Sequence, residues 1–191
     1  ILQDDSVEVI NMDYLETLRN DAKLAEEFDM LFDFCLLDGL EDRDAAEGRC
    51  TFSLPGKAFA RDGAGGEYHQ LEDGCSGYMS SEGECGRIAE SVDDLIHLFV
   101  YSICWQDYCD ASQYTDISTL EAYANERHDE IASYTEMDVW ETVVQALGMP
   151  LEANVAAELQ KFYDAAHRAL LYICYFHEDD GTVTESQNLF F

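Results

Sequence analysis

Seven of the twelve glycines lie within the 32 residues 59–90, interspersed with acidic side chains. Glycines at this density can cradle a phosphate, shape a metal-binding loop or form the turns of a small antiparallel sheet. The sequence lacks the GKS or GKT of a Walker loop and the alternating acids of an EF-hand. The first glycines precede another strand pattern, whereas a dinucleotide-binding motif requires a helix there. The spacing therefore favours structural turns at Gly63, Gly65, Gly66, Gly74 and Gly86.

The turn with the sequence SEGEC carries the acids best placed to meet a partner. Glu82 and Glu84 are two residues apart, so their side chains point the same way where the backbone is extended. This pair could contact a basic protein, or it could be a solvated turn. Arg87 follows closely, and we expect it to form an internal ion pair that fixes the turn. The residues predicted to contact a partner are Glu67, Asp73, Glu82 and Glu84.

The spacing of the cysteines, histidines and acids matches no motif typical of a catalytic nucleophile or a metal site. The seven cysteines include no CxxC pair, and with five histidines and 41 acids some reactive pairing can always be drawn. We therefore predict no catalytic residue, no bound cofactor and no metal ligand. The cysteines are expected to be reduced, as is typical of a cytoplasmic protein.

The secondary structure expected to position these residues changes along the chain, from a helix to short strands and then to further helices. Hydrophobic periodicity predicts a helix over 21–37, then short strands, with Asp73-Gly74 as a two-residue hairpin turn. A capping box at Ser91 opens the next helix. Later helices are expected to begin at 118 and 135, and a third to span 151–176. The tail 177–191 is expected to be weakly structured, with a buried C-terminal strand as the alternative. The predicted strands are 50–54, 57–61, 67–71, 76–80 and 87–90.

The order of strands, glycine turns and helix over 59–101 resembles the SUKH superfamily. Some branches of that superfamily share the turn sequence DGxGG and the later stretch SEGExGR. The matching positions are Asp62, Gly63, Gly65, Gly66, Tyr68, Gly74, Gly77, Tyr78, Ser81, Glu82, Gly83, Glu84, Gly86, Arg87 and Ala89. The N-terminal part, before residue 59, departs from the superfamily pattern.

The resemblance implies an α+β fold with a bent, mostly antiparallel sheet and packed helices, and no enzyme activity. Bacterial members of the superfamily resemble immunity proteins that neutralise toxins, while fungal relatives act as regulatory interaction modules. We therefore predict a SUKH-like α+β domain over 1–110. An all-helical extension over 111–191 is expected to pack on it as one compact unit.

The net charge of −31 favours a basic partner. The acidic excess is spread along the chain, at −9 over 1–40, −7 over 59–100 and −9 over 101–150. Such a field repels nucleic acid and anionic membranes, and it steers basic proteins inward. Taken with the immunity role that the resemblance implies, the charge leads us to expect a cytoplasmic immunity protein that binds a basic toxin. The alternatives are a regulatory or scaffold module, a hydrolase, or a surface that is acidic only for solubility.

Overall fold

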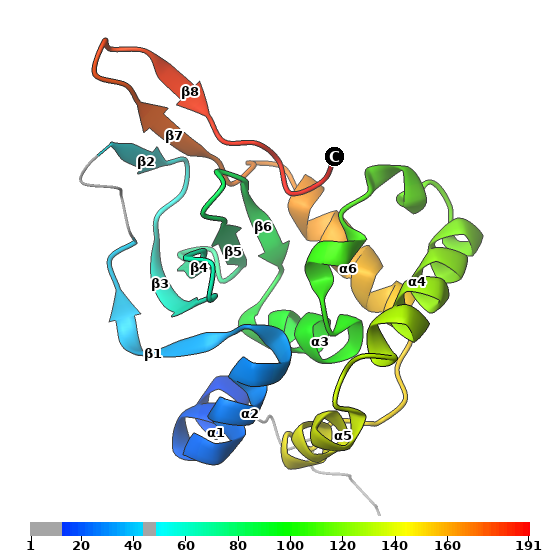
Figure 1. The fold of residues 1–191 in the computed structure, drawn as a ribbon. Helices are drawn as coiled ribbons and strands as arrows, with labels where there is room; N and C mark the ends of the chain where they lie inside the picture. The colour runs from blue at the N-terminus through cyan, green and yellow to red at the C-terminus, as the bar shows by residue number, and fades with distance from the viewer. Residues whose placement is uncertain (1–12, 44–48) are drawn as a thin grey trace, which may run out of the picture.

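A computed structural model of the protein describes residues 13–43 and 49–191, and Figure 1 shows the arrangement of its elements. The helices are α1 Tyr14–Asn20, α2 Ala22–Phe32, α3 Val92–Ser102, η2 Trp105–Tyr108, η3 Ala111–Tyr114, α4 Ile117–Ala132, α5 Met137–Ala146 and α6 Val155–His167, where η marks a 3₁₀ helix. The strands are β1 Cys35–Glu41, β2 Cys50–Phe52, β3 Gly56–Arg61, β4 Glu67–Leu71, β5 Ser76–Met79, β6 Cys85–Ala89, β7 Cys174–His177 and β8 Val183–Glu185.

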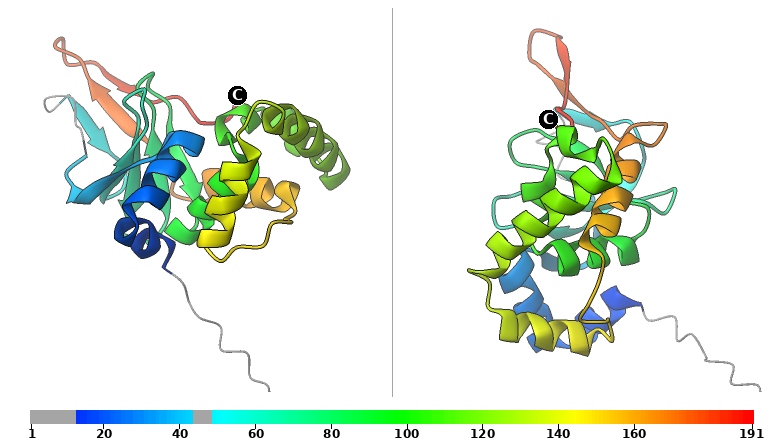
Figure 2. Two further views of the ribbon diagram at one scale, coloured as in Figure 1. Left: turned by 60° about the horizontal axis from the view of Figure 1, so that its bottom comes forward. Right: turned by 90° about the vertical axis from the view of Figure 1, so that its right-hand side faces the viewer.

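Two antiparallel sheets organise the fold. The larger sheet has the strand order β1-β3-β4-β5-β6, and the smaller one has the order β2-β7-β8. In the views of Figures 1 and 2, helices α3–α6 lie to one side of the larger sheet and the β7–β8 hairpin projects from the body. The predicted α+β class with antiparallel strands is confirmed, and each predicted strand overlaps an observed one.

Both faces of the larger sheet are covered. Tyr68 and Ile88 belong to the hydrophobic core shared with the helices. Leu71 and Cys85 belong to a second cluster, formed with residues of β2 and β7. Strands buried on both faces show no hydrophobic-polar alternation, and all five residues of β6 are indeed buried.

The prediction of an all-helical extension over 111–191 is wrong. Helix α6 ends at His167, and Leu170 then adopts a left-handed φ of 63°. Residues 174–177 form β7, which pairs with β2, whose residues lie 122 to 126 positions earlier in the chain. The spacing of apolar residues alone does not distinguish a helix from a strand here. A short apolar run such as LLYICYF suits either a strand or a buried helix.

The predicted helix over 21–37 also ends early. Asp33 closes α2 with a left-handed φ of 53°, and its backbone N–H bonds to the Asp29 carbonyl at 2.8 Å. Asp and Asn tolerate this conformation better than other residues with side chains. The chain then continues as β1, so Cys35 lies in a strand rather than in the predicted helix.

Five of the six α-helices in the described residues begin after a side-chain cap, and only some of these caps were predicted. Ser91 caps α3 as expected, since its hydroxyl accepts from the Asp94 N–H at 3.0 Å. Helix α4 is capped by Asp116 rather than Ser118. Helix α5 begins at Met137, and the sequence analysis did not predict α1.

The C-terminal tail is part of the core. The Gln187 carbonyl accepts from the Cys85 N–H at 2.9 Å, which covers the edge of β6. Leu189 is buried, and the Phe190 ring lies 4.7 Å from the Phe162 ring. Phe191, by contrast, extends its side chain into solvent, with 86% exposed. The prediction of a weakly structured tail is therefore wrong for these residues.

One loop geometry recurs in four hairpins. In each, the first residue's N–H bonds to the carbonyl four residues later, and its carbonyl accepts from the N–H three residues later. The residue at that third step is a glycine with φ between 85° and 97°. These are three-residue hairpin loops with glycine in the left-handed region. The loops are flanked by Asp62 and Gly66, Leu71 and Cys75, Ser80 and Glu84, and Glu178 and Thr182.

The loop at Asp73-Gly74 therefore differs from the predicted two-residue turn. A type I′ turn needs positive φ at both central residues, and here only Gly74 has it, at 88°. We expect Gly74→Val to lower the free energy of unfolding by about 1–2 kcal/mol, because a β-branched residue resists this conformation. Urea unfolding measures the change. Gly39→Val is the matched control, since Gly39 has open space around it and no positive φ. Unchanged stability in both variants would contradict the turn role.

Candidate protein-interaction surface

Most of the basic side chains form ion pairs with acidic side chains. Seven of the ten have an acidic partner within 4.0 Å, all in the part of the chain that the structure describes. Arg43, in addition, donates to the Tyr172 hydroxyl at 3.0 Å and lies 4.0 Å from the Phe52 ring centre. Because the cations are held in this way, the acidic surplus dominates the surface. The seven are Lys23, Lys57, Arg61, Arg87, Arg127, Lys161 and Arg168.

Two hairpin loops lie side by side at one end of the larger sheet. A Cβ on Gly65 would lie 3.9 Å from the Ser81 Cβ. Asp33 joins this group, since its carboxylate accepts from the Gly63 N–H at 2.8 Å. We call the loops 62–66 and 80–84, together with Asp33, the loop end of the sheet. Beside it lies a hollow of about 240 Å³, lined in part by Ser80, Glu84, Gln106 and Gln187.

The four acids predicted to contact a partner occupy different environments. Glu82 is exposed on the 80–84 loop. Glu84 is half-buried and accepts from the Ser80 hydroxyl. Glu67 is buried against Arg61 and His69, so it is unavailable to a partner. The structure thus leaves Glu82 on the surface, holds Glu84 against Ser80 within the same loop, and places Glu67 inside the protein.

Asp73 lies away from the loop end, in the loop between β4 and β5. Its carboxylate pairs with Arg87, whose side chain is only 2% exposed. Arg87 also donates to the Leu170 carbonyl at 3.0 Å. Arg87 therefore makes an internal ion pair, as expected, but with Asp73 rather than with the acids of the 80–84 loop.

The predicted structural glycines serve more than one purpose. Gly65 and Gly74 have positive φ, whereas a Cβ on Gly66 would clash with the hydrogen-bonded pair Asp62 and Tyr78. A Cβ on Gly63 would lie 2.9 Å from the Asp33 carboxylate. Gly86 is not in a turn: it lies within β6, where a Cβ would be 2.9 Å from the Leu189 side chain.

The β7–β8 hairpin presents acids that the sequence analysis did not single out. Glu178, Asp179 and Asp180 are exposed at its tip, which projects from the body in Figure 2. The Asp180-Gly181 dipeptide, between two runs rich in β-formers, is a hairpin signal. The signal was missed because the helix prediction had absorbed the first of these runs.

A buried polar network crosses from the larger sheet to the segment before β7. His69 is fully buried, with Nε2 3.2 Å from a Glu67 carboxylate oxygen and Nδ1 2.8 Å from the Tyr172 hydroxyl. The neutral tautomer that satisfies both contacts donates from Nε2 and accepts at Nδ1. Burial lowers the pKa of His69, with the Glu67 carboxylate opposing. The arrangement is that of a structural network, because its groups are enclosed.

This network predicts a pH dependence of stability. A histidine whose folded pKa lies below its unfolded value of 6.5 binds fewer protons when folded, so stability falls as pH drops through about 6.5. We expect the free energy of unfolding to decrease more steeply from pH 7 to pH 5 in the wild type than in His69→Gln. The excess slope is at most about 1.4 kcal/mol per pH unit. Urea unfolding across this range measures it, and equal slopes would contradict the buried neutral state.

The seven cysteines are free thiols in differing environments. Five are buried, Cys104 is half-buried and Cys35 is exposed. Burial raises the pKa of Cys75 and of Cys104 to about 11, and that of Cys109 to about 12. Thiols that stay protonated are poor nucleophiles and poor metal ligands. Within the described residues, no group of three or more His, Cys, Asp or Glu side chains is arranged to hold a metal ion.

Thiol reactivity should follow this order of exposure. With iodoacetamide at pH 8, we expect Cys35 to be modified first, Cys104 more slowly, and the buried five only after unfolding. Peptide mass spectrometry of the native protein measures the order. Intact mass without reductant is expected to show seven free thiols, and elemental analysis no zinc. Stoichiometric zinc would reopen a metal-dependent hydrolase activity.

Comparison with known proteins adds no assignment, because no protein-family model, curated protein or solved structure matches the chain. Among the helices of the described residues, none combines the length and the apolar character needed to cross a bilayer. The fold, the charge and the geometry of the surface are therefore the grounds for a functional proposal.

Proposed function

We propose that the protein is a non-catalytic immunity protein, which binds and neutralises a cognate bacterial toxin whose active face is basic. The resemblance of residues 59–101 to the SUKH superfamily supports this proposal, because its bacterial members resemble immunity proteins. Nucleases are the favoured class of toxin, since a face that holds a phosphate backbone must be basic. The proposal requires no cofactor and no metal.

The observation that carries the proposal is the pairing of the basic side chains. Seven of the ten are held against acids, while the acids outnumber the bases 41 to ten. A toxin approaching this surface meets many more carboxylates than the protein's own basic side chains can neutralise. Such complementarity sets encounter rate and partner choice more than it sets affinity. Glu82 at the loop end and Asp179 at the hairpin tip are the exposed acids proposed to meet the toxin.

The test uses the toxin domain encoded beside the gene of this protein. We expect a one-to-one complex by light scattering and a loss of toxin activity at equimolar protein. Co-expression should restore the growth of cells that produce the toxin. Folded protein that neither binds nor inhibits this domain would contradict the immunity role. It would favour the regulatory or scaffold module, and catalytic turnover by the purified protein would favour a hydrolase.

A further inference from the structure

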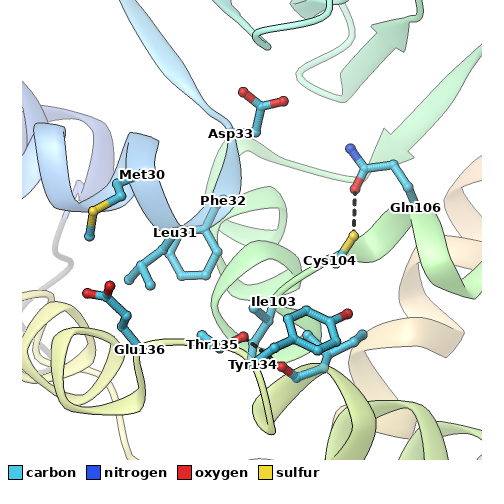
Figure 3. A pocket seen from close by; sticks show the side chains of 11 residues that line it. Met30, Leu31, Phe32, Asp33, Ile103, Cys104, Gln106, Tyr134, Thr135 and Glu136 are labelled. Carbon is cyan, nitrogen blue, oxygen red and sulfur yellow. Dashed lines mark hydrogen bonds between the residues drawn. The ribbon is translucent and has the colours of Figure 1, made fainter.

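A groove of about 420 Å³ lies where α2 meets the turn between α4 and α5 (Figure 3). One wall is the C-terminal end of α2, another is the segment between α3 and η2, and the third is the α4–α5 turn. The side chains in Figure 3 surround an open space rather than filling it. The lining residues are Met30, Leu31, Phe32, Asp33, Ile103, Cys104, Gln106, Ile131, Tyr134, Thr135 and Glu136.

Two large apolar side chains are exposed at this groove. Met30 is 60% exposed and Tyr134 is 67% exposed, although each lies next to buried core residues such as Phe32 and Ile131. Methionine adapts its shape to a bound surface, and tyrosine is enriched at protein interfaces. Together they offer apolar contact area that the fold itself does not use.

The rim of the groove is acidic. Asp33 and Glu136 line it, and none of the described residues that line it is basic. Burial and the nearby Asp33 carboxylate raise the pKa of Asp29, the residue before Met30. Negative charges are therefore crowded here, and a bound cation would relieve their repulsion.

The backbone at the groove is unusual on two of its walls. Asp33 has a left-handed φ of 53°, and Ile103 has a positive φ of 62° with a ψ of −50°. For a β-branched residue such as Ile103 this conformation is an outlier, and such strain concentrates at functional sites. The Ile103 N–H donates to the Phe99 carbonyl at 2.9 Å, at the point where Ile103 lines the groove.

From these features we propose that the groove receives an aromatic or aliphatic side chain of a partner protein, flanked by lysine or arginine. The apolar side chain fills the space between Met30 and Tyr134, and the flanking cation pairs with Asp33 or Glu136. The acidic rim favours an apolar side chain flanked by lysine or arginine. The same side chain flanked by aspartate or glutamate would be repelled. The inference rests on the proposed function, in which that partner is the basic toxin.

The first experiment uses defined peptides and methionine-methyl NMR. The probe is Lys-Lys-Trp-Lys-Lys, and the controls are Lys-Lys-Ser-Lys-Lys and Glu-Glu-Trp-Glu-Glu. We expect the Trp-containing basic peptide to shift the Met30 methyl signal while leaving Met79, which lies in the second hydrophobic cluster, unchanged. The serine peptide tests for binding by charge alone, and the acidic peptide should not bind. Equal Met30 shifts with the serine peptide, or none with the tryptophan peptide, would overturn the proposal.

The second experiment uses the toxin domain and matched variants. Met30→Ala with Tyr134→Ala should weaken binding about tenfold or more, mainly through faster dissociation. Ile117→Ala with Leu151→Ala is the control, since these apolar side chains are also exposed but lie outside the groove. Toxin binding that is unaffected by both pairs would refute the groove and leave the immunity role standing. A groove that binds the tryptophan peptide in a protein that binds no toxin would refute the immunity role alone.

Discussion

Association with the toxin domain is expected to slow by about two to three orders of magnitude as ionic strength rises. Electrostatically steered encounters reach ~10⁸ M⁻¹s⁻¹ at low salt, against ~10⁵–10⁶ M⁻¹s⁻¹ without steering. Salt shortens the Debye length to ~8 Å at physiological strength, which screens charges spread over the whole surface. Dissociation depends on short-range packing and should change little. Stopped-flow kinetics at low and high salt measure both rates.

Charge reversals should show where the encounter is directed. We expect Glu82→Lys and Asp179→Lys each to lower the association rate more than Glu141→Lys, which changes an exposed acid on α5. All three variants change the net charge equally, so the difference reports position rather than total charge. A salt-independent association rate, or an acidic toxin domain, would contradict the electrostatic account. Immunity itself would remain open to the inhibition assay.

Deletion of residues 189–191 is expected to lower the free energy of unfolding by about 4–6 kcal/mol. Leu189 is buried against Gly86, and Phe190 packs on Phe162 and Tyr114. Truncating a buried leucine or phenylalanine costs about 2–5 kcal/mol, and Phe190 is only partly buried. Native proteins have a total free energy of unfolding of about 5–15 kcal/mol. The truncated protein should therefore be close to unfolding. Urea denaturation followed by circular dichroism measures the loss.

Single substitutions separate the side-chain and backbone parts of this effect. Phe191→Ala should change stability by less than about 0.5 kcal/mol, since that side chain is exposed and its backbone bonds to Cys109 and Ala111 are kept. Leu189→Ala should cost about 2–3 kcal/mol. If the deletion unfolded no more readily than Phe191→Ala, the tail would not be part of the core.

The sequence predicted the positions of the local hairpins, though not the loop type at Asp73-Gly74, because the signals for a hairpin are local. Glycine, aspartate and alternating strand residues occur together at 59–90, and α3 starts at the predicted Ser91 cap. The second sheet could not be predicted in the same way. The pairing of β2 with β7 depends on residues 50 and 176 meeting in space, and no local pattern encodes that meeting.

The candidate surface was predicted only in part, for the same reason. The exposed position of Glu82 follows from its place in a turn, whereas Glu67 is buried against Arg61 of the neighbouring strand and against His69. The groove at Met30 and Tyr134 joins segments about 100 residues apart. The sequence does not reveal which apolar residues of these segments the fold leaves exposed.

The long-range pairing of β2 also has a consequence for synthesis on the ribosome. The β3–β6 meander is made of short hairpins, so it can form soon after it emerges, whereas contacts far apart in sequence form slowly. Strand β2 gains its partner only when Cys174 has been made, roughly 120 residues after Phe52. At ~5–20 residues per second this interval is roughly 6–24 s. During that time one face of the nascent meander, with Leu71 and Cys85, is exposed, and we expect this face to be where chaperones bind the growing chain.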